Sequence, residues 1–258
     1  MNQIAMSDQL AQTFRVHIHN VNAYDFSIQG KELTDVSGIG HVIEKVQKHL
    51  GNPKLHAAGS LFVKRYFCTV PLAALYAWTR LNRGYDWSPV NLSFHFDEEG
   101  KWHTQLLNKE EDQPPCEQKK QWREAQTHNL LLETVGPVFR AVAAHTGVSI
   151  STLWAHLSFV VYHYYELWQK EAASEAERKR LADDFRFLTQ ELPAEWFDGV
   201  SYNPFVEGYT YFPHPQEEGR TIRLRTKCCF NYCLPEGRYC YTCPGLTKEQ
   251  RIKRIMGT

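Results

Sequence analysis

The sequence predicts an α+β protein, in which a helix-rich domain with a small antiparallel sheet carries a cysteine-rich module at its C-terminal end. Long stretches with apolar residues at helical spacing predict the helices, and two alternating segments across an Asp-Glu-Glu-Gly turn predict a β-hairpin. Five of the seven cysteines lie within residues 228–243, which sets the last part of the chain apart. We therefore expect a domain over residues 1–214 and a module over residues 215–258.

The first part of the chain is expected to contain one strand and several helices. Residues 13–19 alternate apolar and polar side chains, as a half-buried strand does. Residues 33–50 have the apolar spacing of a helix, and Gly51 is placed to end it. Residues 59–81 predict one or two further helices, with Pro71 either interrupting the run or starting the second helix.

The hairpin is predicted from residues 90–96 and 101–107, which alternate apolar and polar residues on either side of the turn. Residues 108–128 are charged and contain adjacent prolines, so we expect a surface loop there. Cys116 in this segment has no neighbouring cysteine in sequence and is interpreted as functionless.

Further helices are predicted in the second half of the domain. Residues 129–146 and residues 172–192 have helical patterns, the second with a dense run of alternating charges. Between them, residues 149–170 are apolar nearly all round, which predicts a helix buried at the centre of the domain. His156 and His163 lie on one face of that helix and are interpreted as hydrogen-bonded histidines of the core or its boundary. A ligand pocket at this face is the alternative.

Composition and charge exclude some classes of function. The 29 basic and 29 acidic residues balance, so no global field draws the chain to nucleic acid. No run of about eighteen apolar residues exists, so we expect at most peripheral contact with a membrane. Residues 1–12 lack the pattern of a signal peptide, and the odd number of cysteines, with Cys68 and Cys116 unpaired, indicates a reducing compartment. We therefore expect a cytoplasmic protein.

The cysteine-rich segment begins with the vicinal pair Cys228-Cys229 and, after ten residues, continues with a C-x-x-C pair at Cys240 and Cys243. Thiolates crowded in this way hold zinc or an iron–sulfur cluster, or form disulfides. Neighbouring side chains on an extended strand point to opposite faces, so both vicinal sulfurs reach one centre only if the backbone turns there. A 2Fe-2S cluster tolerates more widely spread sulfurs than a single zinc ion, because each of its two irons needs two thiolates. Zinc remains an alternative, and disulfides are the weakest interpretation in a reducing compartment.

Residues 247–250 form a capping box and predict a short basic helix that packs on the cysteine loop. No GxGxxG or GxxxxGK[ST] pattern occurs, so the sequence supports neither a nicotinamide site nor a phosphate loop.

The C-C-x10-C-x2-C arrangement, with a Leu-Pro-x-Gly turn at residues 234–237 and Pro244 behind it, resembles the C-terminal motif of the FhuF-like ferric-siderophore reductases. The resemblance is strong over residues 223–244, and further upstream it consists of scattered matches, at residues 60–66, Leu153-Trp154 and Asn203-Pro204. It implies one 2Fe-2S cluster, whose ligands are Cys228, Cys229, Cys240 and Cys243. Cys233 departs from the four-cysteine pattern, which leaves a ligand swap or a free thiol near the cluster.

The resemblance also implies a function. Residues 1–214 would support siderophore binding, and residues 215–258 would form the iron–sulfur module. The protein would reduce Fe(III) in an imported ferric siderophore, most simply a hydroxamate, by one electron and release Fe(II) in the cytoplasm. The electron would come from an external ferredoxin-like or flavin-bearing donor, and no catalytic residue beyond the cluster is implied. The alternatives are a zinc-clipped siderophore-binding or scaffold protein without redox activity, and an iron–sulfur redox sensor.

Basic residues near the cysteines are candidates for binding an anionic ferric chelate. Arg223, Arg225 and Lys227 alternate along a predicted strand that leads into the vicinal cysteines, which places three cations on one face. Lys64 and Arg65 lie in a stretch that matches the family and are candidates for the same role. The alternative is that the basic row protects an edge strand, as lysine and arginine commonly do.

Overall fold

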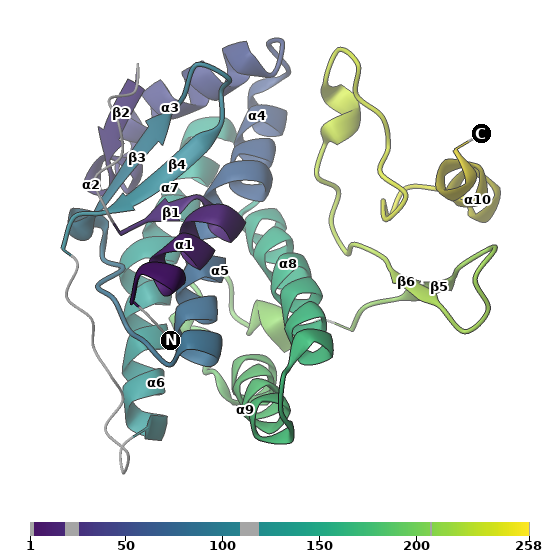
Figure 1. Cartoon of the computed structure of the whole chain (residues 1–258). Coiled ribbons are helices and arrows are strands. Elements are labelled where there is room, and N and C mark those ends of the chain that lie inside the picture. The colour runs from purple at the N-terminus through teal and green to yellow at the C-terminus, as the bar shows by residue number, and fades with distance from the viewer. Residues whose placement is uncertain (1–2, 19–25, 109–118, 207, 258) are drawn as a thin grey trace.

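The computed structural model describes residues 3–18, 26–108, 119–206 and 208–257. Helices pack around a small sheet to form a body, and a C-terminal module lies against one side of it (Figure 1). In chain order, the helices of the body are α1 (Gln3–Phe14), α2 (Gly30–Leu33), α3 (Val36–His49), α4 (Leu55–Phe62), α5 (Thr69–Tyr76), α6 (Lys119–Asn129), α7 (Gly136–Thr146), α8 (Ile150–Glu171) and α9 (Glu175–Arg186). The α+β architecture is therefore as predicted.

The body's sheet has the strand order β1-β4-β3-β2. Its strands are β1 (Val16–His17), β2 (Phe26–Gln29), β3 (Leu92–Phe96) and β4 (Trp102–Leu106). The predicted hairpin is confirmed, with Leu92 opposite Leu106 and Phe96 opposite Trp102. β2 pairs antiparallel with β3, whereas β1 pairs in parallel with β4. The sheet is thus mainly antiparallel, and β1 is the exception because it is separated from β4 by β2, several helices and β3 rather than by a turn.

The strand predicted over residues 13–19 is much shorter in the structure. α1 continues to Phe14, and Arg15 takes a left-handed backbone conformation, with φ of 54°, before β1 begins. An alternation over seven residues fits a helix end followed by a short strand as well as one long strand, so the pattern alone did not separate the two. Residue 19 lies outside the described residues.

The helices predicted from residues 33–50 and 59–81 are confirmed. Asp35 caps α3 by accepting hydrogen bonds from the backbone N–H groups of Ser37 and Gly38, and Gly51 follows the helix with φ of 77°. The second stretch is one helical run in which two π-helical turns, Val63–Phe67 and Ala77–Leu81, alternate with α4 and α5. Pro71 lies in the first turn of α5, where its missing N–H has no helical partner to lose.

The prediction of a surface loop over residues 108–128 is wrong for the second half of this segment, which forms α6. The charges and the two prolines of this segment predicted a loop, but the prolines precede the helix in sequence. The charged residues from 119 to 129 suit a helix that is largely exposed to solvent, with Thr127 as its buried residue. Residues 109–118, with Cys116, lie outside the described residues. A π-helical turn, Leu130–Val135, joins α6 to α7, and α7 ends at Gly147 with φ of 71°.

α8 is buried on all sides only in its first half. Its residues from Thr152 to Ser158 are buried, whereas Phe159 and Val160 are half-buried and His163 is exposed. The prediction of a helix buried throughout is therefore wrong for the second half, which leaves one face open toward the C-terminal module. His156 lies in the buried half, so the two histidines have different surroundings and do not form a pair.

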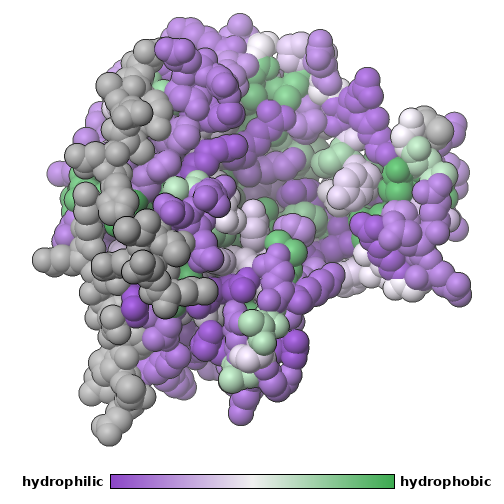
Figure 2. All heavy atoms as spheres, viewed as in Figure 1, coloured by the Kyte–Doolittle hydropathy of each residue, from purple (hydrophilic) through white to green (hydrophobic). Residues whose placement is uncertain are grey.

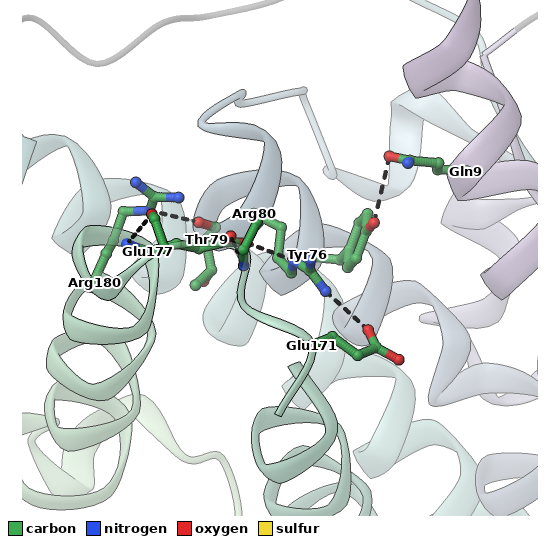
Figure 3. A network of polar contacts seen from close by, with 9 residues as sticks. Gln9, Tyr76, Thr79, Arg80, Glu171, Glu177 and Arg180 are labelled. Carbon is green, nitrogen blue, oxygen red and sulfur yellow. Dashed lines mark hydrogen bonds and ion pairs between the residues drawn. The ribbon is translucent and has the colours of Figure 1, made fainter. Parts of the chain in front are cut away.

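A polar network joins α8 and α9 to the run that contains α5 (Figure 3). Arg80 donates to Glu177 and to Glu171, both at 3.0 Å, and Arg180 donates to the carbonyl oxygen of Thr79 at 2.9 Å. These contacts fix the surface helix predicted over residues 172–192, which is confirmed as α9 and the π-helical turn Phe187–Glu191.

The C-terminal module contains the two-stranded sheet β5 (Tyr211–Pro213) and β6 (Thr221–Arg223), a long loop with the cysteines, and α10 (Lys248–Met256). The predicted capping box is confirmed, because Thr247 and Gln250 bond each other's backbone N–H groups. Arg251 of α10 donates to the carbonyl oxygens of Tyr241 and Cys243, so α10 packs on the cysteine loop as predicted.

Within the described part of the chain, every helix is either too short or too polar to span a bilayer.

Candidate metal centre

The four predicted ligands meet in two pairs. The Sγ atoms of Cys229 and Cys240 are 3.8 Å apart. Burial raises the pKa of the Cys228 thiol, and Cys243 acts on Cys228 and raises that pKa further, so we take these two cysteines as the second pair. Two thiolates on one tetrahedral metal with metal–sulfur bonds of about 2.3 Å lie about 3.8 Å apart, so the first pair already has the spacing of a shared metal. Each pair takes one member of the vicinal motif and one of the C-x-x-C motif.

The backbone of the loop makes this pairing possible. Phe230, directly after the vicinal pair, is in the left-handed conformation with φ of 57°, which turns the chain back. Gly237 closes the next turn by donating to the carbonyl oxygen of Leu234 at 2.8 Å. A Cβ at Gly237 would lie 2.1 Å from the carbonyl oxygen of Asn231, so the turn requires glycine. The N–H of Arg225 bonds the carbonyl oxygen of Thr242 at 2.9 Å and joins the two halves of the segment.

The cysteine loop is seated on α4 and the π-helical turn that follows it. The hydroxyl of Ser60 donates to the carbonyl oxygen of Cys229 at 3.3 Å, and Lys64 Nζ donates to Cys229 Sγ at 3.1 Å. Arg65 donates to the side-chain oxygen of Asn231 at 2.7 Å. These contacts come from the stretch at residues 60–66 that resembles the reductase family, so that stretch serves as the seat of the cysteine loop.

A buried histidine lies behind this seat. His156 Nε2 is 2.8 Å from the hydroxyl of Ser60, and both residues are buried completely or nearly so. Burial lowers the pKa of His156 well below its ordinary value, and the charges of Arg225 and Lys64 lower it further. The ring is therefore neutral near pH 7, and its Nδ1 atom has no hydrogen-bond partner among the described residues.

The paired thiols differ in acidity. The hydrogen bond from the Cys240 thiol lowers the pKa of Cys229 to about 4, with a further contribution from Lys64, whereas the same hydrogen bond raises the pKa of Cys240. Cys229 is thus a thiolate in the metal-free protein, which is the form that binds metals. Burial raises the pKa of Cys228.

The two other cysteines of the described residues, Cys233 and Cys68, belong to neither pair. Cys233 interacts with its neighbour Tyr232, and Cys68 is in the core, where burial raises the pKa of its thiol to about 12. Across the described residues, no three Cys, His, Asp or Glu side chains converge on one point as ligands of a single ion would. Two separate thiol pairs suit a centre with two metal atoms better than one zinc ion.

A cavity of about 720 Å³ opens beside the cysteines, between the second half of α8 and the module. In the space-filling view the surface is hollowed where the module meets the body (Figure 2). Cys240 lines this cavity, and one carboxylate, Glu166, is among the lining residues. The basic lining residues are Lys64, Lys170, Arg220, Arg223, Arg225 and Arg254, with His163 and His214.

The predicted docking cations are placed differently from one another. Lys64, Arg223 and Arg225 line the cavity, whereas Lys227 is exposed and is not among the residues that line it. β6 ends at Arg223, so the predicted row of three cations on one strand is wrong. Arg65 is engaged with Asn231 in the seat of the loop.

Arg223 and Arg225 also have structural contacts. Arg223 is 8% exposed, forms an ion pair with Glu166 and lies among the rings of Phe159, Tyr162, Tyr209 and Tyr211. Arg225 stacks on Phe159 at 3.9 Å, and its Nε and Nη1 atoms have no hydrogen-bond partner among the described residues. Arg223 therefore fastens the module to α8, whereas Arg225 packs on Phe159 with two buried donors that have no partner among the described residues.

Several residues of this site were not predicted. Ser60 contacts His156, which lies 96 residues further along the sequence, and Cys229, which lies 169 residues further along. Lys170, Arg220 and Arg254 of the cavity come from three separate elements or loops. No local sequence pattern connects such residues. The family-like stretch at residues 60–66 was the one available signal for Ser60.

The fold and the site together define an α+β protein with a paired-thiol centre beside a basic cavity. The sequence profile of the family described as "Ferric iron reductase FhuF-like transporter" matches residues 60–207, and the chain belongs to this family. The family description indicates an oxidoreductase that acts on ferric iron and a place in iron acquisition. The match includes Ser60, Lys64 and Arg65 of the seat and the whole of α8, but it ends before the four paired cysteines. No curated protein matches the chain.

Proposed function

We propose that this protein reduces the ferric iron of a siderophore by one electron, through a 2Fe-2S cluster held by its two cysteine pairs. The observation that carries the proposal is the position of Cys240, which belongs to one thiol pair and also lines the basic cavity. A ferric chelate in that cavity would lie directly beside the centre.

The residues fit such a cluster. Cys229 and Cys240 would bind one iron, and Cys228 and Cys243 the other, which is the four-cysteine set that a 2Fe-2S cluster takes. When bound, the cluster supplies reversible one-electron transfer. The chain holds these thiols in place through Ser60 and Lys64 on one side and Arg251 on the other.

One electron is sufficient to release iron from a siderophore. Hard anionic oxygen ligands hold Fe(III) much more tightly than the less charged Fe(II). Reduction therefore weakens the chelate, and Fe(II) is lost from it or captured. The protein then needs no nucleophile and no pair of proton-transfer groups.

The cavity is suited to a ferric chelate by its size and its charge. Its lining contains six Lys and Arg side chains and a single carboxylate, that of Glu166, which forms an ion pair with Arg223. A concave site with one sign of charge concentrates ligands of the opposite sign. Hydroxamate siderophores are the substrates that the family resemblance implies, and the excess of cations favours chelates that carry negative charge.

We further propose that the electron comes from a separate ferredoxin-like or flavin-bearing donor in the cytoplasm. The absence of a Gly-rich nucleotide motif from the sequence supports this part of the proposal. A zinc-clipped scaffold is less well supported, because the thiols lie in two pairs rather than around one point. A redox sensor would share the centre but would not need a basic cavity beside it.

The test has two steps. Protein purified without oxygen is expected to contain about two irons and two acid-labile sulfides per chain, and one stoichiometric zinc would refute the cluster. Reduced protein is then mixed with a ferric hydroxamate and, separately, with an anionic ferric chelate, each with a ferrous trap. We expect reoxidation of the protein in step with formation of the trapped Fe(II). A reduced cluster that persists beside excess chelate would exclude the reductase and favour the sensor.

A further inference from the structure

The charges around the two thiol pairs are unequal. Lys64 Nζ is 3.1 Å from Cys229 Sγ, and the charges of Lys64 and Arg225 both act on Cys240. On the other pair, Cys228 experiences the charges of Cys229 and Cys243. Arg251 interacts with one cysteine of each pair, with Cys243 more strongly than with Cys240.

Lys64 has a fixed position in this arrangement. It belongs to the π-helical turn Val63–Phe67, a kind of turn that is frequent at functional sites. The side chain is half-buried, and its hydrogen bond goes to a sulfur atom rather than to a carboxylate. Its charge is therefore available to the thiolate and is less screened by water than an exposed charge would be.

We infer that Lys64 is a positioning residue for the transferred electron: it favours the iron bound by Cys229 and Cys240, on the side that faces the cavity. This inference rests on the proposed function. An added electron is an added negative charge, and a nearby cation stabilises it. Hydrogen bonds to sulfur and local charge are among the factors that set the potentials of iron–sulfur centres.

The consequence is a direction for electron transfer. Lys64 and Cys240 both line the cavity, so the favoured iron is the one beside a bound ferric chelate. The electron arrives from the external donor and leaves to the Fe(III) of the chelate, and no bond is made or broken at Lys64. The lysine that sequence analysis assigned to substrate docking would therefore act mainly on the centre.

The test compares Lys64→Met with Lys227→Met in the cluster-loaded full chain, without any siderophore. Lys227 directly precedes the ligand Cys228 in sequence, but its side chain is exposed, so its charge is screened by water and salt. For Lys64→Met we expect the equilibrium constant of reduction to fall about tenfold, which is about 59 mV for one electron. Lys227→Met is expected to change it less than about threefold, and Lys64→Arg should retain most of the wild-type value.

A second measurement locates the electron. Proton NMR of the reduced protein, labelled in the cysteine side chains, distinguishes thiolates on ferrous iron from those on ferric iron by the temperature dependence of their shifts. Cys229 and Cys240 are expected to show ferrous character in the wild type, and this preference should weaken in Lys64→Met. Ferrous character at Cys228 and Cys243 in the wild type, or equal potentials for the two lysine variants, would overturn the inference. A protein without a cluster would instead refute the proposed function.

Discussion

The placement of Arg223 leads to a prediction about how the module is held to the body. The sequence suggested that Arg223 and Lys227 are equivalent members of a docking row, whereas the structure makes one a clamp and leaves the other exposed. Replacing each by methionine separates these roles, because methionine keeps the length of the apolar stem and removes the charge. We expect Arg223→Met to loosen the module and Lys227→Met to have almost no effect on stability.

The magnitude follows from the contacts of Arg223. A hydrogen bond to a charged partner contributes about 1.5–3 kcal/mol, but we take about 1 kcal/mol because the side chain of Glu166 is 50% exposed. The rings around the guanidinium add about 1 kcal/mol, the closest centroid, that of Tyr162, being 5.1 Å away. Arg223→Met should therefore lower the free energy of opening the module by about 2 kcal/mol. Surface substitutions such as Lys227→Met stay within about 0.5 kcal/mol.

The assay is urea unfolding of the cluster-loaded protein, followed both by the visible absorption of the cluster and by far-ultraviolet circular dichroism. With a slope of about 2 kcal/mol per molar urea, the loss of 2 kcal/mol shifts the midpoint of the visible band by about 1 M. The helical signal of the body should shift less, since the module opens as a local unit. Equal midpoints for the two variants, or a larger shift for Lys227→Met, would refute the assignment of Arg223 as the clamp.

Two further predictions concern the cysteine loop. Serine at any of the four paired cysteines should abolish or grossly alter the visible spectrum, whereas Cys68→Ser should keep it, because Cys68 is buried in the core and belongs to neither pair. A variant of Cys233 that loses colour while one of the four keeps it would contradict the ligand assignment. Gly237→Ala should reduce the iron content and shorten the lifetime of the cluster in air, since the added Cβ would lie 2.1 Å from a backbone oxygen. The control Gly208→Ala should behave as wild type, because its Cβ would meet no atom within 4 Å. Equal iron content in the two variants would contradict the requirement for glycine at position 237.

Sequence alone determined the features that depend on a few neighbouring residues. The β-hairpin followed from alternation across a short turn, the end of α7 from Gly147, and the start of α10 from Thr247 and Gln250. In each case the hydrogen bonds or the buried face involve residues close in the chain, so the local pattern contains the information. The exceptions were α1 and α6, whose apolar or charged residues fit more than one local structure until they pack against the body.

Tertiary structure alone decided how the cysteines pair and what surrounds them. The sequence named the four thiols but could not tell that Cys229 pairs with Cys240 and Cys228 with Cys243, because the pairing depends on turns at Phe230 and Gly237. Lys64 approaches Cys229 across 165 positions. Such contacts arise when separately formed helices and loops pack together, and their geometry depends on the sum of many side-chain volumes rather than on a local spacing. The same packing gives the three cations of the predicted row different places: Arg223 holds the module to α8, Arg225 lines the cavity, and Lys227 is exposed.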